Sequence, residues 1–318
     1  MRVAVRVDVS RQIGTGHLRR MANLIAALPG AEPIYLIRTD TPDNALLAEL
    51  PAFIAGSETH EDRMVLECRK ASPDLLVLDL LRYPVGTVAR YRSTVKVPVV
   101  TLHEHHDWDD SSDLIINYNT FDRFEAYEGA TMLAGPRYCI IGDGIRNLRR
   151  APRTRTVLAT FGGSDPSGFA DSMVENVAPL LLETQFEVYD GPLSSSRWHV
   201  GASGGRDNVR RIASGEEFFS AMAKCGTAVT AAGNSMYEFI YLGLKPLVVA
   251  HNEHQAEFAR NAERIGACEY MGRHPRIDWE KLTAEISRQN SARGVSTADL
   301  IDGRGAERIA DRLERLCR

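Results

Sequence analysis

Hydrophobic and polar residues follow two different periods at the start of the chain. The valines within residues 3–9 alternate with polar residues, which leaves Arg6 and Asp8 on the opposite side of an extended segment. From Leu18 to Leu28 the apolar residues recur at helical spacing. The stretch "IGTGH" lies between the two patterns. The pattern therefore predicts a strand, a glycine loop and a helix, with His17 at the junction of loop and helix.

The rest of the first half continues this alternation. Short apolar runs bounded by turn signals predict strands at 4–9, 33–37, 74–80, 97–102 and 113–117. Helices are predicted at 43–50 and 84–92. Strands that alternate with helices favour a parallel sheet covered on both faces.

A basic, proline-containing stretch, "RNLRRAPRTR", interrupts the pattern and predicts a linker. A second series follows, with strands predicted at 156–161, 186–190, 227–232 and 246–250 and helices at 167–182, 216–223, 235–242 and 254–264. An amphipathic helix is predicted at 305–317. We therefore expect domains at 1–148 and 149–302, with 303–318 packing back on the first, and ligands in a cleft at the carboxyl ends of the two sheets.

Composition narrows the classes of function. The 318 residues are 44% apolar and 25% charged, with a net charge of −4, so a soluble two-domain protein is expected and no basic surplus favours nucleic acid. The five scattered cysteines suit a reducing compartment. No apolar run reaches the length of a membrane span, and the N-terminus runs directly into a strand. We expect a cytoplasmic protein without membrane insertion.

The glycine loop before His17 is the first candidate site. Gly14 and Gly16 allow a close approach of the backbone to a ligand, and the helix start that follows favours an anion. The same helix end favours the neutral imidazole that a general base requires. The alternative is a tight turn with a capping histidine.

A second glycine loop follows the first strand of the second half. "FGGSDPSG" places Gly162, Gly163 and Ser164 between a strand and a helix start, which again predicts an anion site. The alternative is an ordinary turn in which Asp165 or Ser167 caps the helix.

The third candidate is "AAGNSMYEF", where Asn234 and Ser235 follow a strand and Glu238 lies one turn into a helix. Glu238 could accept hydrogen bonds from the vicinal diol of a ribose. The alternative is a capping box, with Ser235 as the cap and Glu238 reaching back. Further along, Asn252, His254 and Gln255 gather where the next strand meets its helix.

A histidine-rich stretch, "TLHEHHDWDD", contains side chains of the kinds that bind metals. These are His103, Glu104, His105, His106 and Asp107. Adjacent residues of an extended chain point to opposite faces, so they cannot all converge on one ion, and no metal site is predicted.

Taken together, these segments resemble the PseG family of UDP-sugar hydrolases of pseudaminic acid biosynthesis. "RVDVSRQIGTGHLRR" carries the specific likeness, and "FGGSDP", "AAGNSMYEFIYLGLKPLVV" and "GPRY" are shared with the wider GT-B superfamily, including MurG. The resemblance implies a GT-B fold of two Rossmann-like domains, a UDP-sugar ligand and inverting hydrolysis without a required metal or cofactor. It implies that His17 helps water to attack, and that Glu238 holds the ribose.

The resemblance also implies binding roles for the other candidates. Gly162 and Gly163 match the loop near the uridine, and Asn234 and Ser235 match positions near the phosphates. The full set of expected substrate-binding residues is Arg6, Asp8, Gly14, Gly16, Gly162, Gly163, Ser164, Asn234, Ser235, Glu238, His254 and Gln255.

The chain departs from the family pattern at the sugar end. Leu80 and Leu81 follow Asp79 where the family has a histidine and a tyrosine, His103 and Glu104 replace paired aspartates, and Gly142 replaces an arginine. We therefore expect a hydrolase that releases UDP from a UDP-activated deoxy-amino sugar. A GT-B glycosyltransferase that uses a UDP-sugar and a non-catalytic UDP-sugar binding protein are the alternatives. The sugar and the oligomeric state are not readable from the sequence.

Overall fold

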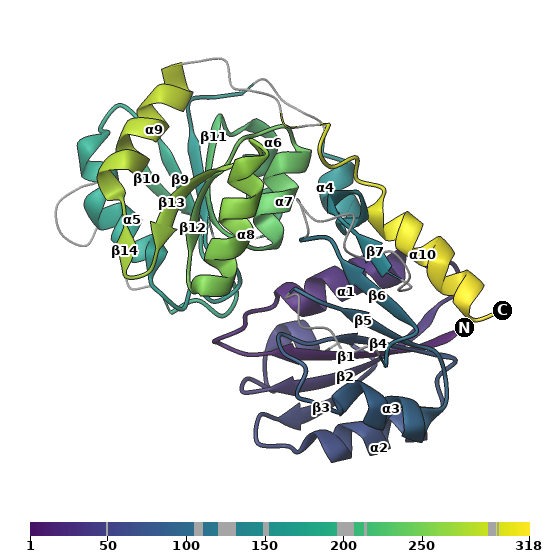
Figure 1. The fold of residues 1–318 in the computed structure, drawn as a ribbon. Helices are drawn as coiled ribbons and strands as arrows, with labels where there is room; N and C mark the ends of the chain where they lie inside the picture. Colours follow the sequence, from purple (N-terminus) through teal and green to yellow (C-terminus); the bar gives the residue numbers. More distant parts are fainter. Residues whose placement is uncertain are drawn as a thin grey trace. The chain divides into compact units, whose positions relative to one another are not determined.

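The chain forms two compact units (Figure 1). The computed structural model describes residues 1–48, 50–104, 111–119, 132–148, 153–195, 207–212, 215–291, 297 and 299–318. Unit 1 comprises Met1–Gly142 and Arg304–Arg318, and unit 2 comprises Asp143–Gly303. The division after Gly142 falls a few residues before the position that the linker composition suggested. Both units are α/β with parallel sheets, which confirms the predicted fold class.

Unit 1 is built on a parallel sheet whose described strands run in the order β3-β2-β1-β4-β5-β6-β7. The strands are β1 (Arg2–Val9), β2 (Glu32–Thr39), β3 (Ala52–Gly56), β4 (Leu75–Asp79), β5 (Val99–Leu102), β6 (Leu114–Asn117) and β7 (Met132–Ala134). The helices are α1 (Gly16–Ala26), α2 (Glu61–Ala71), α3 (Thr87–Val95) and α10 (Gly305–Leu316), with 3-10 turns η1 (Ala45–Leu47) and η3 (Pro136–Tyr138).

The helices of unit 1 cover both faces of its sheet. On one face, α1 lies beside α10 (Figure 1). On the other, Met64 of α2 and Tyr91 of α3 are fully buried against strand residues such as Leu76. All the residues of β4, β5 and β6 are buried, as expected for strands covered on both faces.

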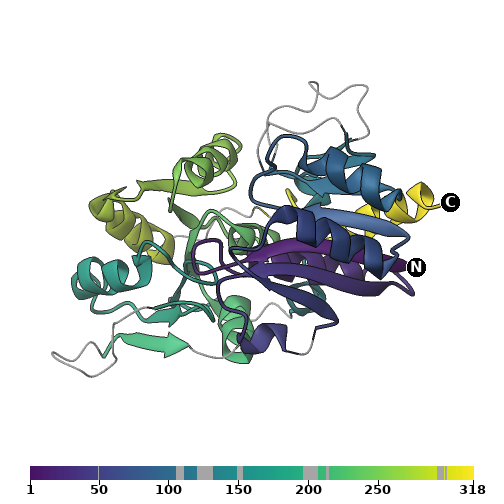
Figure 2. The ribbon, with the colours of Figure 1, turned by 90° about the horizontal axis from the view of Figure 1, so that it is seen from below.

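The C-terminal helix belongs to unit 1, where it packs against α1 and η3. Gly305 begins α10 so close to the Cys139 carbonyl that a Cβ atom there would lie 2.0 Å from the oxygen. Arg308 donates to the Arg137 carbonyl at 2.8 Å. The two ends of the chain therefore lie close together (Figures 1 and 2).

Unit 2 repeats the architecture, with strands in the order β10-β9-β8-β11-β12-β13-β14 and only β14 antiparallel among those described. The strands are β8 (Val157–Thr160), β9 (Phe186–Tyr189), β10 (Val209–Ile212), β11 (Thr227–Ala231), β12 (Leu247–Ala250), β13 (Glu269–Arg273) and β14 (Arg276–Ile277). The helices are α4 (Asp143–Arg146), α5 (Phe169–Asn176), α6 (Gly215–Lys224), α7 (Asn234–Tyr241), α8 (Glu253–Arg264) and α9 (Trp279–Ser291), with a 3-10 turn η4 (Ala178–Leu180).

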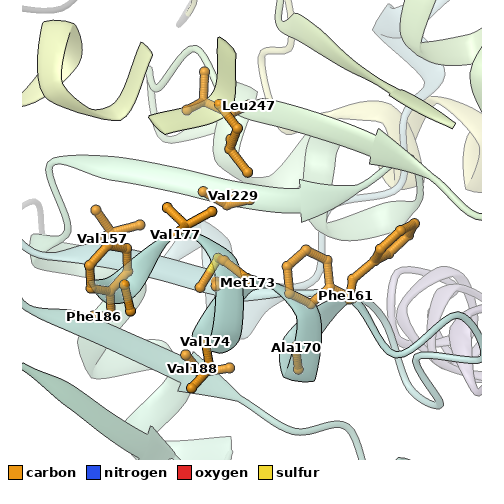
Figure 3. Packing of buried hydrophobic residues seen from close by; sticks show 14 of the residues in the cluster. Val157, Phe161, Ala170, Met173, Val174, Val177, Phe186, Val188, Val229 and Leu247 are labelled. Atoms are coloured by element: carbon orange, nitrogen blue, oxygen red, sulfur yellow. The ribbon is translucent and has the colours of Figure 1, made fainter. Parts of the chain in front are cut away.

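The core of unit 2 fills the space between α5, α9 and the sheet. Met173 of α5, Phe186 of β9 and Val229 of β11 belong to one buried cluster (Figure 3). Leu282 of α9 is part of the same cluster. Each of these four side chains is at most 1% exposed. Their burial removes apolar surface from water and so stabilises the packing of both helices on this sheet.

Three predicted helices have different bounds in the structure. The helix expected at 43–50 is only the turn η1 among the described residues. The helix expected at 84–92 begins at Thr87, after Gly86 adopts φ +79°. The helix expected at 167–182 ends at Asn176, because Pro179 lacks the amide that a continuing helix needs.

Several elements were not predicted at all. They include β3, β13 and the helices α2 and α9. The helix α2 has the sequence EDRMVLECRKA and buries only Met64, Val65 and Cys68, so its apolar stripe is narrow.

Among the described residues, no helix combines the length and the apolar composition that crossing a membrane requires.

Candidate active site

The loop before α1 brings His17 to the carboxyl edge of the unit 1 sheet. It leaves β1 after Val9, and Gly14 turns the chain with φ +81°, a backbone conformation that glycine adopts without strain. The Gly14 amide donates to the Ser10 carbonyl at 2.6 Å, and the Ile13 amide donates to the Ser10 hydroxyl at 3.0 Å. His17 is the second residue of α1 and is 6% exposed. The strand, loop and helix predicted from the sequence are therefore present.

His17 contacts a carboxylate that the sequence did not single out. Asp79, the last residue of β4, is fully buried, and its Oδ1 lies 2.7 Å from His17 Nδ1. The Nε2 of His17 makes no hydrogen bond to a described residue, and the His17 side chain is 8% exposed. Nε2 is therefore the ring nitrogen left for a substrate.

Arg20 lies one turn after His17 on the same face of α1 and contacts both partners of this pair, with its Nη2 3.0 Å from His17 Nδ1. Its Nε donates to Asp79 Oδ2 at 2.6 Å, and its Nη2 donates to Asp79 Oδ1. Its Nη1 donates to Glu104 Oε1 at 2.5 Å and to the Tyr118 hydroxyl at 3.0 Å. The four polar residues form one buried cluster around His17.

The charges in this cluster set the protonation of His17 and Asp79. Burial alone would raise the pKa of Asp79, but Arg20 and His17 hold it below its ordinary value, so the carboxylate is ionised. An ionised Asp79 accepts the Nδ1 proton, which leaves Nε2 with the lone pair of a general base. Burial and the charge of Arg20 lower the pKa of His17, but the charge and hydrogen bond of Asp79 together with the charge of Glu104 outweigh them, so that the pKa lies above its ordinary value. The helix start was expected to favour the neutral ring; the nearby carboxylate opposes that effect.

Tyr83 and His103 form a stacked pair beside the same cluster. Their ring centroids are 4.4 Å apart, with 27° between the planes. The Tyr83 hydroxyl lies 2.7 Å from the Leu78 carbonyl and 2.8 Å from the Leu102 carbonyl, at the ends of β4 and β5. Burial raises the pKa of Tyr83 well above its ordinary value. The loop after Asp79 thus does contain a tyrosine, but its hydroxyl is turned into the sheet edge.

Arg6 is not placed to contact a ligand, contrary to the prediction. It is fully buried, its Nε and Nη2 donate to Glu61 at 2.9 Å, and its Nη1 donates to Asp8 at 2.6 Å. Asp8 also accepts from Arg38 at 2.9 Å and keeps 14% of its side-chain exposure. The guanidinium of Arg6 is therefore used to hold two carboxylates.

The loop after β8 in unit 2 is shaped by its glycines. Gly162 has φ +90°, and Gly191 approaches so closely that a Cβ atom there would lie 2.3 Å from the Gly162 carbonyl oxygen. Gly162 is exposed, whereas Ser164 is only 6% exposed. This close approach holds the loop against the end of β9.

At the start of α5, where an anion site was predicted, a side chain already occupies two of the backbone amides. The carboxylate of Asp165 accepts from the amides of Phe169 at 2.9 Å and Ala170 at 2.8 Å. Asp165 has φ +43°, and its burial raises its pKa to about 6. A side chain of the loop therefore already occupies the amides that an anion would use.

His251, which the sequence analysis did not single out, ties two loops of this edge together. Its Nε2 donates to the Phe161 carbonyl at 3.1 Å, and its Nδ1 accepts from the Ser167 hydroxyl at 2.9 Å. The ring stacks on Phe169, with centroids 4.6 Å apart. Burial lowers the pKa of His251 to about 4, so it stays neutral and structural. Its place directly after β12 was the only signal in the sequence.

The start of α7 carries Asn234, Ser235 and Glu238. Gly233 is the N-cap, and no side chain caps this helix, so the capping box expected for Ser235 is absent. Asn234 and Ser235 are partly exposed, and Glu238 is 5% exposed. The helix N-terminus and the nearby carboxylate remain candidates for binding a phosphorylated nucleoside.

Gln255 serves the start of α8. The Asn252 side chain accepts from the Gln255 amide at 3.0 Å, and the Gln255 side chain accepts from the His251 amide at 2.9 Å. His254 is partly buried and packs edge-on against Phe258, with ring centroids 4.1 Å apart. Part of the hydrogen-bonding capacity of Gln255 is thus used within the helix cap.

The histidine-rich stretch is described only in part. His103 is 4% exposed and Glu104 contacts Arg20, whereas His105, His106 and Asp107 lie outside the described residues. In the part of the chain that is described, no group of three His, Cys, Asp or Glu side chains is arranged to hold a metal ion.

The fold is the GT-B fold of nucleotide-sugar glycosyltransferases. The glycotransferase of kitacinnamycin superimposes with a TM-score of 0.65 at 15% identity, covering 99% of this chain and 98% of that one. MurG of Acinetobacter baumannii gives 0.64 at 12% identity, covering 99% and 100%. UGT89C1 of Arabidopsis thaliana, solved with UDP, gives 0.63 at 10% identity, covering 100% of both chains.

Among curated proteins, the chain resembles the spore coat polysaccharide biosynthesis protein SpsG of Bacillus subtilis (strain 168). The two are 25% identical over an alignment that covers 99% of this chain and 98% of that protein. No family model matches the chain.

Proposed function

We propose that this chain is an enzyme that acts on a sugar nucleotide and that His17 is its general base. The observation that carries the proposal is the 2.7 Å contact between His17 Nδ1 and the buried Asp79. A carboxylate on Nδ1 directs the lone pair of the ring to Nε2 and stabilises the imidazolium that forms when Nε2 takes a proton. The similarity to SpsG, whose name refers to polysaccharide biosynthesis, and the GT-B fold support a sugar-nucleotide substrate.

The proposed reaction is hydrolysis of a UDP-activated deoxy-amino sugar. Nε2 of His17 takes a proton from water as the water oxygen attacks the anomeric carbon, and the bond from that carbon to the diphosphate breaks with its electrons going to UDP. The transition state has oxocarbenium character, so positioning and electrostatics supply most of the acceleration.

Unit 2 is proposed to bind the UDP. Glu238 accepts hydrogen bonds from the ribose hydroxyls, and the start of α7, with Asn234 and Ser235, faces the diphosphate. The exposed Gly162 in the loop after β8 offers backbone groups to the base. The amides at the start of α5 take no part in this proposal, because Asp165 occupies them.

A glycosyltransferase is the second candidate. It is favoured by the glycosyltransferases that share the fold and by the polysaccharide pathway in the name of SpsG. The chemistry at His17 is the same, with a sugar hydroxyl in place of water as the nucleophile.

Turnover without an added acceptor separates the candidates. Purified protein is incubated with a panel of UDP-activated deoxy-amino sugars, and free sugar and UDP are followed by NMR. Release of equal amounts of free sugar and UDP supports the hydrolase, provided that His17→Ala abolishes this release. The control His60→Ala, at an exposed histidine, is expected to keep it. Release of UDP only when a glycan acceptor is added supports the transferase. Binding without turnover under either condition contradicts both and leaves a UDP-sugar binding protein.

A further inference from the structure

We propose that Arg20 and Glu104 are positioning residues that set the charge around His17, so that the buried cluster is neutral only when both nitrogens of the imidazole hold a proton. The proposal rests on the proposed function, because it concerns the proton that His17 takes from the attacking water. It assigns to the two residues a specific electrostatic task, in addition to their packing.

The residues around His17 form one connected set of contacts. Arg20 from α1 is 4% exposed, Asp79 from β4 is fully buried, and Glu104, which follows β5, keeps 17% of its side-chain exposure. Tyr118, which follows β6, is 4% exposed and contacts Arg20 through its hydroxyl at 3.0 Å. Arg20 contacts each of the other three.

The formal charges of this cluster do not cancel in the resting state. Asp79 and Glu104 contribute two negative charges and Arg20 contributes one positive charge. Tyr118 stays neutral, because burial raises its pKa well above the ordinary value. With a neutral imidazole the cluster therefore carries a net charge of −1, and with an imidazolium it carries none.

A buried cluster is more stable when its charges cancel, since water cannot screen the excess. The cluster is therefore matched to the state that exists after proton abstraction, as preorganised catalytic sites are. Within it Asp79 and Glu104 stabilise the imidazolium, whereas Arg20 opposes it and keeps Asp79 ionised, so Nδ1 retains its proton.

The two residues are therefore predicted to move the titration of His17 in opposite directions. Glu104→Gln removes a negative charge, so the imidazolium is less stable and the titration midpoint of His17 moves to lower pH. Arg20→Met removes the opposing positive charge, so the midpoint moves to higher pH. If the two residues had a purely structural role, both variants would lose stability, but the His17 midpoint would not move in opposite directions.

The test is an NMR titration of the full-length chain labelled at the histidine ring carbons, with His17→Asn assigning the resonance. Variants Glu104→Gln, Arg20→Met and Arg20→Lys are compared with Arg19→Met, which removes an exposed arginine next to Arg20. We expect shifts of opposite sign for Glu104→Gln and Arg20→Met, none for Arg19→Met, and recovery towards the wild-type midpoint in Arg20→Lys. Shifts of the same sign, or no shift in Glu104→Gln, overturn the proposal.

Failure of this proposal and failure of the proposed function are distinguishable. The titration needs no substrate, so it reports on Arg20 and Glu104 even where no sugar nucleotide is turned over. If Arg20→Met does not fold, Glu104→Gln decides alone, because that side chain is partly exposed and uncharged glutamine has the same size. Where turnover is measured, the acidic limb of kcat/KM is expected to move with the NMR midpoint in each variant.

Discussion

A double-mutant cycle on His17 and Asp79 tests the site most directly. If the carboxylate acts through the imidazole, His17→Ala and Asp79→Asn remove the same catalytic contribution. General base catalysis contributes about 10²- to 10⁴-fold, or about 3–5 kcal/mol of transition-state stabilisation, and each single variant is expected to lose that amount of kcat/KM. The double variant is expected to lose no more than either single variant.

The structure explains why the two losses should not add. The Nδ1–Oδ1 contact is 2.7 Å, Asp79 is fully buried, and its other partner is Arg20, which is 4% exposed. Asp79 therefore has no described route to a substrate except through these two side chains. Independent effects would instead multiply to about 10⁴- to 10⁸-fold in the double variant.

The assay measures UDP release in each of the four proteins across substrate concentrations, and calorimetry measures the affinity of each for UDP. Since Asp79→Asn removes one partner of a buried ion pair, it can cost about 3–5 kcal/mol of folding stability. Rates are therefore divided by the fraction that binds UDP, and the exposed His60→Ala serves as the matched control. Multiplicative losses in the double variant would refute the view that His17 and Asp79 act as one unit.

Three further outcomes are expected. Because only the neutral imidazole of His17 acts as a base and its pKa is raised, kcat/KM should fall as the pH decreases, starting above about pH 6.5. Asp79→Asn should move this fall to lower pH. If the fall in kcat/KM does not move, His17 is not the base that Asp79 supports. Glu238→Gln should weaken UDP binding by about 1.5–3 kcal/mol in calorimetry, and it should weaken the binding of 2′,3′-dideoxy-UDP much less. Equal losses of affinity for both ligands exclude a contact between Glu238 and the ribose hydroxyls. Arg6→Met removes both guanidinium hydrogen bonds to Glu61, which among the described residues keeps only its contacts with Tyr91 and Arg38, and should cost about 3–5 kcal/mol in chemical denaturation. Arg69→Met, at an exposed position of α2, should be near neutral. A small loss in Arg6→Met argues against a tightly coupled network.

The sequence predicted the elements that bury continuous apolar runs. The strands around Leu76 and Val248 were found because parallel strands covered on both faces are rich in apolar residues, whereas the strand around Val5 was found from its alternating valines. It did not predict α2, which buries only Met64, Val65 and Cys68 among many charged residues. Short, sparsely buried elements give a weak periodic signal, so tertiary packing rather than local pattern decides them.

The alternatives for the candidate sites were decided by contacts that the local pattern did not specify. At α5, the N-cap residue is Gly168 rather than Asp165 or Ser167, but the Asp165 carboxylate accepts from the first two amides of the helix. At α7, Gly233 stands where Ser235 had been expected to cap. Both depend on the turn geometry of one or two residues, which hydrophobic periodicity does not report.

By itself, the sequence determined the two α/β units and the position of His17 at the first turn of a helix, because both follow from local spacing of apolar residues and glycines. Only the tertiary structure decided what surrounds that imidazole. The strand order places β4, β5 and β6 successively beyond β1, so residues 59, 84 and 98 positions from Arg20 meet it at one sheet edge. Ion pairs over such separations depend on which strands become neighbours, and no periodic pattern along the chain encodes that choice.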